Sequence, residues 1–296
     1  MSHHSPANKK PLVITVTNQK GGTGKTTLTA LLAYGLAERG YNVLMLDLDP
    51  QAHLSSFFLK INEIESINDG VIELAQNKEF HIRKLDLRTK GTIALVPSGL
   101  NYIMKVYRGE LPFMDPYAAY KRISREPAIT NNYDYVICDS PPELFTPTIW
   151  GLYAADFILI PTNLEELSLA GVKLLIKDVL PDIMYTSRRD LKILGVALIN
   201  VTGHHRSDSK VILRLKESLI KFLKTMPRYV REKIHKDPLF NTIIYRYEGL
   251  KDLPYRPRRY EIPLKRVIES NTKLYENIRD FTKELLDRVH NFEGLQ

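Results

Sequence analysis

A glycine-rich stretch near the start of the chain combines the residue types that bind phosphate. Three glycines, Gly21, Gly22 and Gly24, stand directly before Lys25 and Thr26. Glycines let the backbone approach an anion closely, so that successive N–H groups point at phosphate oxygens. A lysine at this place reaches the terminal phosphates of a nucleotide, and the hydroxyl that follows it ligates Mg²⁺. The stretch therefore predicts a nucleotide site in which Lys25 binds phosphate and Thr26 binds the metal.

The segments on either side of the glycines fit such a loop. An apolar run at residues 12–16 precedes it and an apolar-periodic segment at residues 28–36 follows it, which predicts a strand, a loop and a helix in that order. The positive end of the helix dipole then lies at the phosphates. One position departs from the usual G-x-x-x-x-G-K-[ST] spacing, because Gln19 stands where that pattern has its first glycine. A second lysine, Lys20, directly precedes the glycine pair.

Apolar runs alternate with helix-length periodic segments through most of the chain. Near-continuous apolar character predicts strands that are buried on both faces, as in a parallel sheet. The predicted strands are residues 12–17, 42–46, 92–96, 133–138, 157–160 and 193–199. The predicted helices include residues 28–39, 167–179 and 211–223, and a long C-terminal helix at 267–289. This alternation predicts an α/β fold with a doubly wound, mostly parallel sheet flanked by helices.

Polar residues follow several of these predicted strands. A sheet of this kind binds its ligand at the carboxyl ends of its strands. Asp47 and Asp49 follow the second run, Asp139 follows the fourth, and Asn200 follows the last. An aspartate at a strand end holds Mg²⁺, which makes Asp139 a candidate ligand, and a second carboxylate could orient an attacking water. The alternative is that these aspartates are helix N-caps, a position that aspartate favours.

The composition is that of an ordinary globular protein. The chain has 296 residues, of which 44% are hydrophobic and 26% charged, and its single cysteine, Cys138, excludes a disulfide framework. No apolar run approaches the roughly 20 residues that span a bilayer. We expect residues 1–10 to form a disordered leader, because they are polar and lack the apolar segment of a secretory signal. Residues 11–296 are then a single domain, with a basic C-terminal third at about 200–266 and a C-terminal helix at about 267–290.

The positive charge is concentrated in the C-terminal third. Residues 200–266 contain 17 lysines and arginines against 7 aspartates and glutamates, a net charge of +10, whereas the whole chain carries +8. The remaining residues therefore carry a net charge of −2. Such a local excess indicates an electrostatic partner, first of all nucleic acid. The alternative is a solvated basic face with ordinary ion pairs.

The glycine stretch and three later segments together resemble ParA-type partition ATPases. Residues 20–27 resemble the deviant Walker A box of that family, residues 47–51 its Walker A′ box, and residues 137–142 its Walker B box. Residues 155–161 are similar to the family's next strand and the proline after it. MinD-type division regulators and the nitrogenase iron protein are wider relatives. The resemblance implies a P-loop NTPase fold of the deviant Walker A type, hydrolysis of ATP to ADP and phosphate, and ATP and Mg²⁺ as cofactors.

The family also implies roles for individual residues. Lys20 resembles the signature lysine, which reaches across an ATP-sandwiched homodimer to the partner's phosphates. Asp49 matches the residue that positions the hydrolytic water, so that Lys20, Lys25 and Asp49 form the expected catalytic set. Asp47 and Asp139 match the residues near Mg²⁺, with Thr26 as a direct ligand. The nucleotide-binding residues are then Lys20, Gly21, Gly22, Thr23, Gly24, Lys25, Thr26, Thr27 and Asn200, the last of these at the adenine.

The resemblance extends to DNA. Arg206 and Arg246 match the family's DNA-contacting arginines, and both lie in the basic third. Arg256, Arg258 and Arg259 belong to a segment, residues 254–260, that does not align; they are further DNA contacts or part of a solvated face. The implied function is DNA segregation of a plasmid or chromosome. The ATP-bound homodimer binds DNA non-specifically and is released when a ParB-type centromere-binding protein stimulates hydrolysis.

The same resemblance implies a cytoplasmic, nucleoid-associated protein that does not bind membranes. MinD-type relatives end in a short basic amphipathic helix, whereas residues 291–296 contain no basic residue. His53 stands where many relatives have a small polar residue; it faces either the nucleotide or the surface, and we expect the surface. Thr23 and Ser140 replace the commoner valine and the commoner threonine or cysteine, without loss of a functional group. Two other functions remain open: positioning of another cargo, such as a division site or a protein organelle, and a small-molecule ATP-dependent ligase or kinase.

Overall fold

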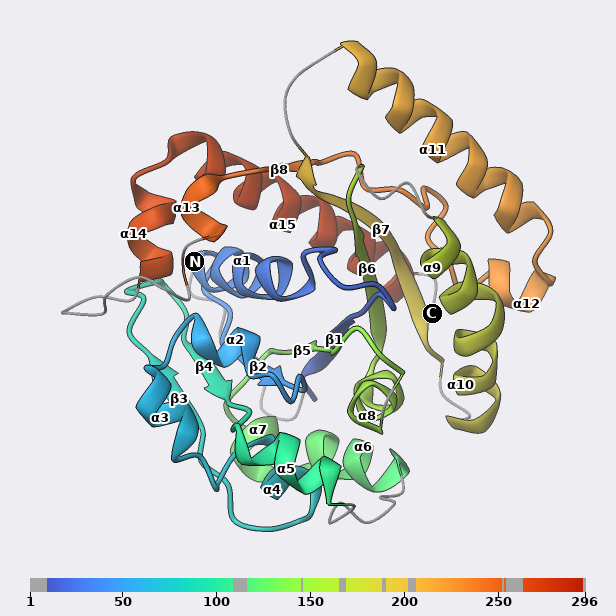
Figure 1. The fold of residues 1–296 in the computed structure, drawn as a ribbon. Coiled ribbons are helices and arrows are strands. Elements are labelled where there is room, and N and C mark those ends of the chain that lie inside the picture. The colour runs from blue at the N-terminus through green and yellow to red at the C-terminus, as the bar shows by residue number, and fades with distance from the viewer. Residues whose placement is uncertain are drawn as a thin grey trace.

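A sheet of eight strands forms the centre of the molecule (Figure 1). The computed structural model describes residues 10–108, 116–144, 146–164, 169–187, 190–201, 206–251, 253 and 263–294. The strand order in this part of the chain is β3-β4-β2-β5-β1-β6-β7-β8. The strands are β1 (Leu12–Val16), β2 (Val43–Asp47), β3 (Arg83–Leu85), β4 (Ile93–Val96), β5 (Tyr135–Asp139), β6 (Phe157–Thr162), β7 (Lys192–Val201) and β8 (Ile244–Tyr245). All neighbouring strands are parallel except β3 and β4, which confirms the predicted mostly parallel α/β fold.

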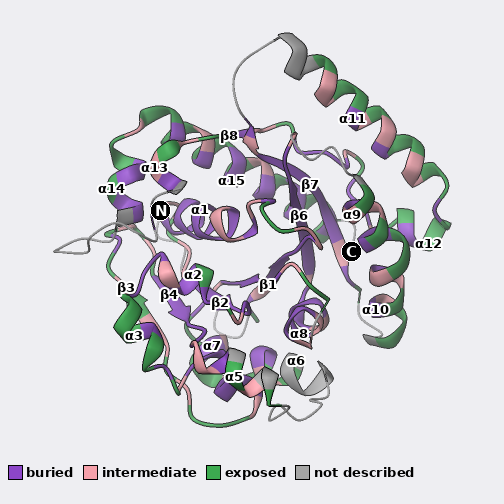
Figure 2. Ribbon diagram, in the orientation of Figure 1, coloured by how far each residue is buried: buried purple, intermediate pink, exposed green. Residues whose placement is uncertain are grey.

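The six strands predicted from apolar runs are all present, each within two residues of its predicted ends. Nearly all residues of these strands are buried, as near-continuous apolar runs require (Figure 2). β3 was not predicted, because this three-residue antiparallel edge strand contains one apolar residue, Leu85. The predicted leader at residues 1–10 falls almost entirely outside the described residues.

Helices cover both faces of the sheet. The longer ones are α1 (Lys25–Glu38), α6 (Pro116–Arg125), α8 (Thr146–Ala154), α10 (Leu180–Ser187), α11 (Arg206–Lys224) and α15 (Thr272–Glu293). The shorter ones are α2 (His53–Ser56), α3 (Ile61–Glu65), α4 (Val71–Ala75), α5 (Asn101–Tyr107), α7 (Pro127–Thr130), α9 (Leu169–Leu174), the π-helix η1 (Leu175–Val179), α12 (Arg228–Arg231), α13 (Glu248–Lys251) and α14 (Pro263–Glu269). Within the described ranges, no helix is both long enough and apolar enough to span a lipid bilayer.

The core is divided between the two faces of the sheet. One face carries a single large cluster, to which α1, α14 and α15 contribute. The other face carries two larger clusters, one beneath α8 to α11 and one beneath α4, α6 and α7, and Ala75 and Trp150 form a small separate cluster. Figure 1 shows α11 at the rim of the molecule, where one of its sides faces away from the sheet.

The C-terminal region differs from the prediction of one helix at 267–289. It forms two helices, α14 and α15, which are separated at residues 270–271. The Asn271 side chain accepts a hydrogen bond of 3.1 Å from the backbone N–H of Leu274, and so caps a new helix. The prediction of a single helix was wrong because the apolar spacing continues across the break. The helix predicted at 167–179 extends further than predicted, through η1 and α10 to Ser187.

A buried arginine fixes α15 to the sheet. Arg288 is 2% exposed, and its guanidinium lies 3.9 Å from the centre of the Phe240 ring. It donates hydrogen bonds to the backbone oxygens of Leu194, Asp237 and Leu239. It also forms an ion pair of 2.8 Å with Glu284, one turn earlier on the same helix. Since a buried charge is tolerated only when it is paired and hydrogen-bonded, this set of contacts anchors α15 against β7.

Candidate functional site

The glycine loop connects β1 to α1 and has the backbone shape of a phosphate-binding loop. Gly22 and Gly24 have φ angles of +73° and +81°, in the left-handed region that glycine tolerates. A Cβ atom on Gly21 or Gly22 would meet no protein atom within 4 Å, so the space beside them is open. Because α1 begins at Lys25, the unpaired N–H groups of its first turn lie at the same place. The local structure fits a bound phosphate group.

Contacts inside the loop and with β6 hold its shape. The Lys25 ammonium donates a hydrogen bond of 2.9 Å to the backbone oxygen of Lys20, and the Thr23 hydroxyl donates to the same oxygen at 3.2 Å. The Asn18 amide donates to the Pro161 oxygen at 2.7 Å, which ties the loop to the carboxyl-terminal half of β6. Burial lowers the pKa of Lys25, while Asp139 and Asp49 act in the opposite direction.

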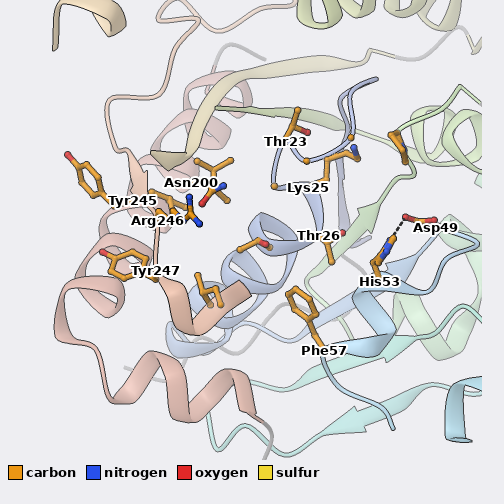
Figure 3. A pocket seen from close by; sticks show the side chains of 18 residues that line it. Thr23, Lys25, Thr26, Asp49, His53, Phe57, Asn200, Tyr245, Arg246 and Tyr247 are labelled. Carbon is orange, nitrogen blue, oxygen red and sulfur yellow. Dashed lines mark hydrogen bonds and ion pairs between the residues drawn. The ribbon is translucent and has the colours of Figure 1, made fainter. Parts of the chain in front are cut away.

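A cavity of about 460 Å³ opens beside the loop (Figure 3). This volume is in the usual range for small-molecule sites. The lining residues are Gly21, Gly22, Thr23, Gly24, Lys25, Thr26, Thr27, Asp49, His53, Phe57, Pro142, Ile199, Asn200, Ile244, Tyr245, Arg246, Tyr247 and Leu250. The cavity thus gathers the predicted residues from Gly21 to Thr27 with Asp49 and Asn200. Asp139 and Asp47 do not line it; each forms a hydrogen bond with a lining residue.

Thr26 and Asp139 form the pair that fits Mg²⁺. The Thr26 hydroxyl donates a hydrogen bond of 2.8 Å to the Asp139 carboxylate, which is fully buried at the end of β5. Burial raises the pKa of Asp139 well above its usual range, and the neighbouring carboxylate of Asp47 raises it further. A bound cation would offset this cost, and hydroxyl and carboxylate oxygens are the ligands that Mg²⁺ prefers. These two side chains could therefore hold the metal that a nucleotide triphosphate requires.

Asp47 is buried beneath the site and does not line the cavity, although the sequence placed it at the strand end beside Asp49. It is fully buried, and one carboxylate oxygen accepts hydrogen bonds from the backbone N–H and the hydroxyl of Ser55, at 2.7 and 2.6 Å. Its other oxygen accepts the backbone N–H of Asp49 at 3.1 Å. Burial raises the pKa of Asp47 to about 7, against the opposing effect of the Ser55 hydrogen bonds. The predicted role of Asp47 near Mg²⁺ stays a prediction, and these contacts give it the further task of shaping the turn that carries Asp49.

Asp49 lines the cavity and has a partner that was not predicted. One carboxylate oxygen accepts the backbone N–H of Gln51 at 2.9 Å, and the other accepts Nδ1 of His53 at 3.1 Å. The hydrogen bond that His53 donates to the Asp49 carboxylate raises the pKa of His53. His53 was expected at the surface, and its side chain is 62% exposed, yet it also lines the cavity beside Asp49. The pair depends on the turn at residues 49–52, in which Ala52 has a φ angle of +54°, and no helical spacing in the sequence predicts it.

The opposite end of the cavity is formed by β7, β8 and the residues after them. Asn200 has a φ angle of +60° at an irregularity in the pairing of β7 with β8. Asparagine adopts this left-handed conformation more readily than most residues, and such bulges redirect side chains. Figure 3 shows Asn200 beside Arg246, Tyr245 and Tyr247, across the cavity from Asp49. The two tyrosines and Phe57 were not predicted as part of the site.

The comparisons with known proteins agree with this geometry. The family model of the AAA domain matches residues 12–193, more than half of the chain. The chain belongs to this family, as a P-loop ATPase of the ParA and MinD type. It is 29% identical over 243 residues to the sporulation initiation inhibitor protein Soj of Bacillus subtilis, covering 82% of this chain and 87% of Soj.

Solved structures share the fold of this P-loop ATPase. The structure of pNOB8 ParA superposes with a TM-score of 0.82 at 23% identity, covering 95% of this chain and 99% of that one. The structure of pNOB8 ParA bound to nonspecific DNA superposes with a TM-score of 0.78 at 21% identity, again covering 95% of this chain and 99% of that one. Cobyrinic acid a,c-diamide synthase from Mycobacterium smegmatis, with bound ATP analogue and magnesium, gives 0.64 at 25% identity, covering 83% and 91%.

The DNA-binding residues predicted for this ATPase are only partly described. Arg246 lines the cavity and forms an ion pair of 2.9 Å with Glu248, so it adjoins the nucleotide site. Arg206 is the first residue of α11, and its side chain lies outside the described part of the structure. Arg256, Arg258 and Arg259 lie outside the described residues altogether.

Proposed function

We propose that this ATPase segregates DNA by an ATP-controlled cycle of dimerisation and DNA binding. The observation that carries the proposal is the loop itself, in which Lys20 precedes a phosphate-binding backbone and the Thr26–Asp139 pair. When bound at that pair, Mg²⁺ supplies positive charge at the terminal phosphates. Lys25 binds the same phosphates, and Asp49, at the cavity wall, orients the water that attacks. These roles support hydrolysis of ATP to ADP and phosphate.

The proposed dimer depends on Lys20. Its backbone oxygen is used inside the loop, as the acceptor for both Lys25 and Thr23. Its place directly before the glycine pair supports the role of a lysine that reaches the nucleotide of a second protomer. Since a site completed by two chains requires bound nucleotide between them, ATP would promote the homodimer and hydrolysis would weaken it.

The DNA surface that we propose includes the outer face of α11. Four basic side chains, Lys210, Arg214, Lys221 and Lys224, are exposed and recur at helical spacing along it, with Glu217 as the acid among them. None of the four forms an ion pair with another described residue. Such a basic stripe suits DNA phosphates, which fix position without reading sequence. Because Arg206 begins the same helix, its predicted DNA contact would extend this stripe.

The proposed cycle has one further partner. A ParB-type centromere-binding protein would stimulate hydrolysis and release the ATPase from DNA, and binding to bulk DNA would place the protein on the nucleoid. The decisive test is DNA binding with ATP, with ADP and without nucleotide, across a salt series. We expect affinity that requires ATP and falls steeply with salt, because neutralised phosphates release counterions. The variant Asp49→Ala, in which hydrolysis should be impaired, should remain bound to DNA in the presence of ATP. Equal affinity in all three nucleotide states would contradict the proposal.

The same site could serve a different cargo or a ligase. The ATPase residues alone do not separate DNA segregation from the positioning of another cargo, so the DNA experiment is the discriminating one. The shared fold of a diamide synthase keeps a ligase activity as a second candidate. A product assay distinguishes the two activities. The proposed ATPase should form ADP and phosphate without an acceptor substrate, whereas a ligase should form them only when an acceptor substrate is present.

A further inference from the structure

The carboxylate of Asp49 is held from two sides. Its first oxygen accepts the Gln51 backbone N–H and its second accepts the His53 ring, so neither oxygen turns freely. Asp49 is 6% exposed, and that small exposed surface faces the cavity that it lines. The hydrogen bond from Gln51 comes from the backbone N–H, which every residue except proline supplies. The hydrogen bond from His53 depends on the side chain.

The backbone is bent to bring His53 to this place. Ala52, directly before it, is buried and has a φ angle of +54°, a left-handed conformation that is unfavourable for alanine. The Ala52 N–H donates a hydrogen bond of 2.9 Å to the backbone oxygen of Asp49, which closes the turn, and α2 begins at His53. The ring therefore returns over Asp49, at the edge of the cavity (Figure 3).

We propose that His53 is a positioning residue for Asp49. Its Nδ1–H fixes the carboxylate rotamer, so that the remaining lone pairs face the place of the attacking water. This inference rests on the proposed role of Asp49 in hydrolysis. A carboxylate that rotates would present the right geometry for only part of the time, and small misplacements of a catalytic group reduce rates strongly.

The exposure of the ring argues against a role in stability alone. With 62% of its side chain exposed, His53 buries little apolar surface, and an exposed ion pair contributes about 0–1 kcal/mol to folding. The carboxylates of Asp49, Asp47 and Asp139 all raise the pKa of the ring, against the effect of its burial, and Asp49 is the one that forms a hydrogen bond with it. Of these three carboxylates, only Asp49 lines the cavity, and Asp49 is the one that the His53 ring contacts.

The test compares two substitutions at this position with a matched control. His53→Ala removes the donor, whereas His53→Asn places an amide nitrogen at about the same distance from the backbone as Nδ1. His81→Ala is the control, because His81 forms a similar pair with Asp69, at 3.0 Å and 58% side-chain exposure, away from the lining of the cavity. All three variants are checked by thermal unfolding before ATP hydrolysis is measured.

We expect His53→Ala to lower kcat by about 10- to 100-fold with KM for ATP changed less than about twofold, since orientation and not binding is lost. His53→Asn should recover most of the rate, and His81→Ala should match the wild type. In the Asp49→Ala background, His53→Ala should have no further effect. Wild-type kcat in His53→Ala, or an equal loss in both His53 variants, would overturn the inference. A wild-type rate in Asp49→Ala would instead overturn the proposed function on which it rests.

Discussion

The Thr26 hydroxyl and the Asp139 carboxylate are joined by a hydrogen bond of 2.8 Å, which links the first turn of α1 to the last residue of β5. The residues that follow Thr26 in sequence belong to the phosphate loop's helix, and Asp139 is buried in the sheet. A carboxylate in that environment needs a positive or hydrogen-bonding partner, and Thr26 is the partner that also lines the cavity.

Thr26→Ala should therefore weaken nucleotide binding in the presence of Mg²⁺ by about tenfold or more, because it removes one of the two proposed Mg²⁺ ligands and the hydroxyl that donates to the other, Asp139. Titration calorimetry with a non-hydrolysable ATP analogue, with and without Mg²⁺, measures the effect. Thr26→Ser keeps the hydroxyl and should bind like the wild type. A loss of the same size in Thr26→Ser would show that the methyl group, and not the hydroxyl, matters.

Substitutions of the two lysines in the loop should affect nucleotide binding and dimerisation separately. Lys25→Ala should abolish nucleotide binding, since its ammonium is the phosphate-binding charge. Lys20→Ala should keep much of the nucleotide binding but lose the ATP-dependent dimer. Fluorescent-nucleotide titration and light scattering after size exclusion measure the two properties. An ATP-dependent dimer of normal stability in Lys20→Ala would contradict the role of this lysine between protomers.

Charge reversal on α11 should weaken DNA binding without affecting ATP. The double variant Arg214→Glu/Lys221→Glu should reduce DNA affinity and lower the slope of log K against log salt by about 0.9 for each lost phosphate contact. The control, Lys273→Glu/Lys283→Glu, makes the same charge change on exposed residues of α15. An equal loss of affinity in both double variants would mean that net charge alone, and not the α11 face, determines binding.

Because α1 packs closely on α15 at Gly35, a larger side chain at this position should destabilise the fold. A Cβ atom at Gly35 would overlap the Thr282 hydroxyl and lie 2.9 Å from Cγ2 of Ile278. Gly35→Ala should lower the free energy of unfolding by about 1–3 kcal/mol through overpacking, although alanine favours helix more than glycine does. Urea unfolding measures the change. Adding Thr282→Ala should restore part of the loss, and no restoration would point to a different cause.

Glu284 should give the fold a pH-dependent stability. Burial would raise the pKa of Glu284, but hydrogen bonds from the backbone N–H groups of Asn241 and Thr242 and from Arg288 outweigh it, and the net pKa is lowered. A carboxyl whose pKa is lower in the folded state stabilises the protein above its unfolded pKa and loses that contribution as pH falls through the folded value. Glu284→Gln should therefore be less stable by about 1–2 kcal/mol at pH 7. Urea unfolding at pH 7 and pH 4 should show a smaller difference at pH 4, and a constant difference would contradict the assignment.

Much of the site followed from general rules about strands and glycines. The common position of Asp49, Asp139 and Asn200 at one edge of the sheet was predicted because parallel strands direct the residues at their carboxyl ends to one edge. The loop from Gly21 to Thr27 was found because glycine and lysine at these spacings serve phosphate. Both rules depend on local sequence and on the direction of strands, which apolar runs reveal.

The features that were missed depend on contacts between segments or on short elements. Tyr245 reaches the cavity from β8, a strand of only two residues, and Tyr247 reaches it from the segment just after that strand, so neither belongs to an element long enough to predict from the sequence. The burial of Asp47 beneath Ser55 depends on a turn closed by a left-handed alanine, Ala52. The division of the C-terminal helix depends on one asparagine, Asn271, whose capping side chain interrupts a spacing that otherwise continues.

The close contact of α1 with α15 also limits how the protein can be divided. The family model ends at residue 193, yet the apolar side of α15, with Ile278, Phe281 and Leu285, belongs to the same core cluster as α1 and β1. A fragment cut near residue 193 would expose the outer face of the phosphate-loop helix to water and release the Arg288 anchor. The nucleotide-binding half and the C-terminal helix therefore share one hydrophobic core. Any minimal ATPase engineered from this chain has to retain residues 272–293.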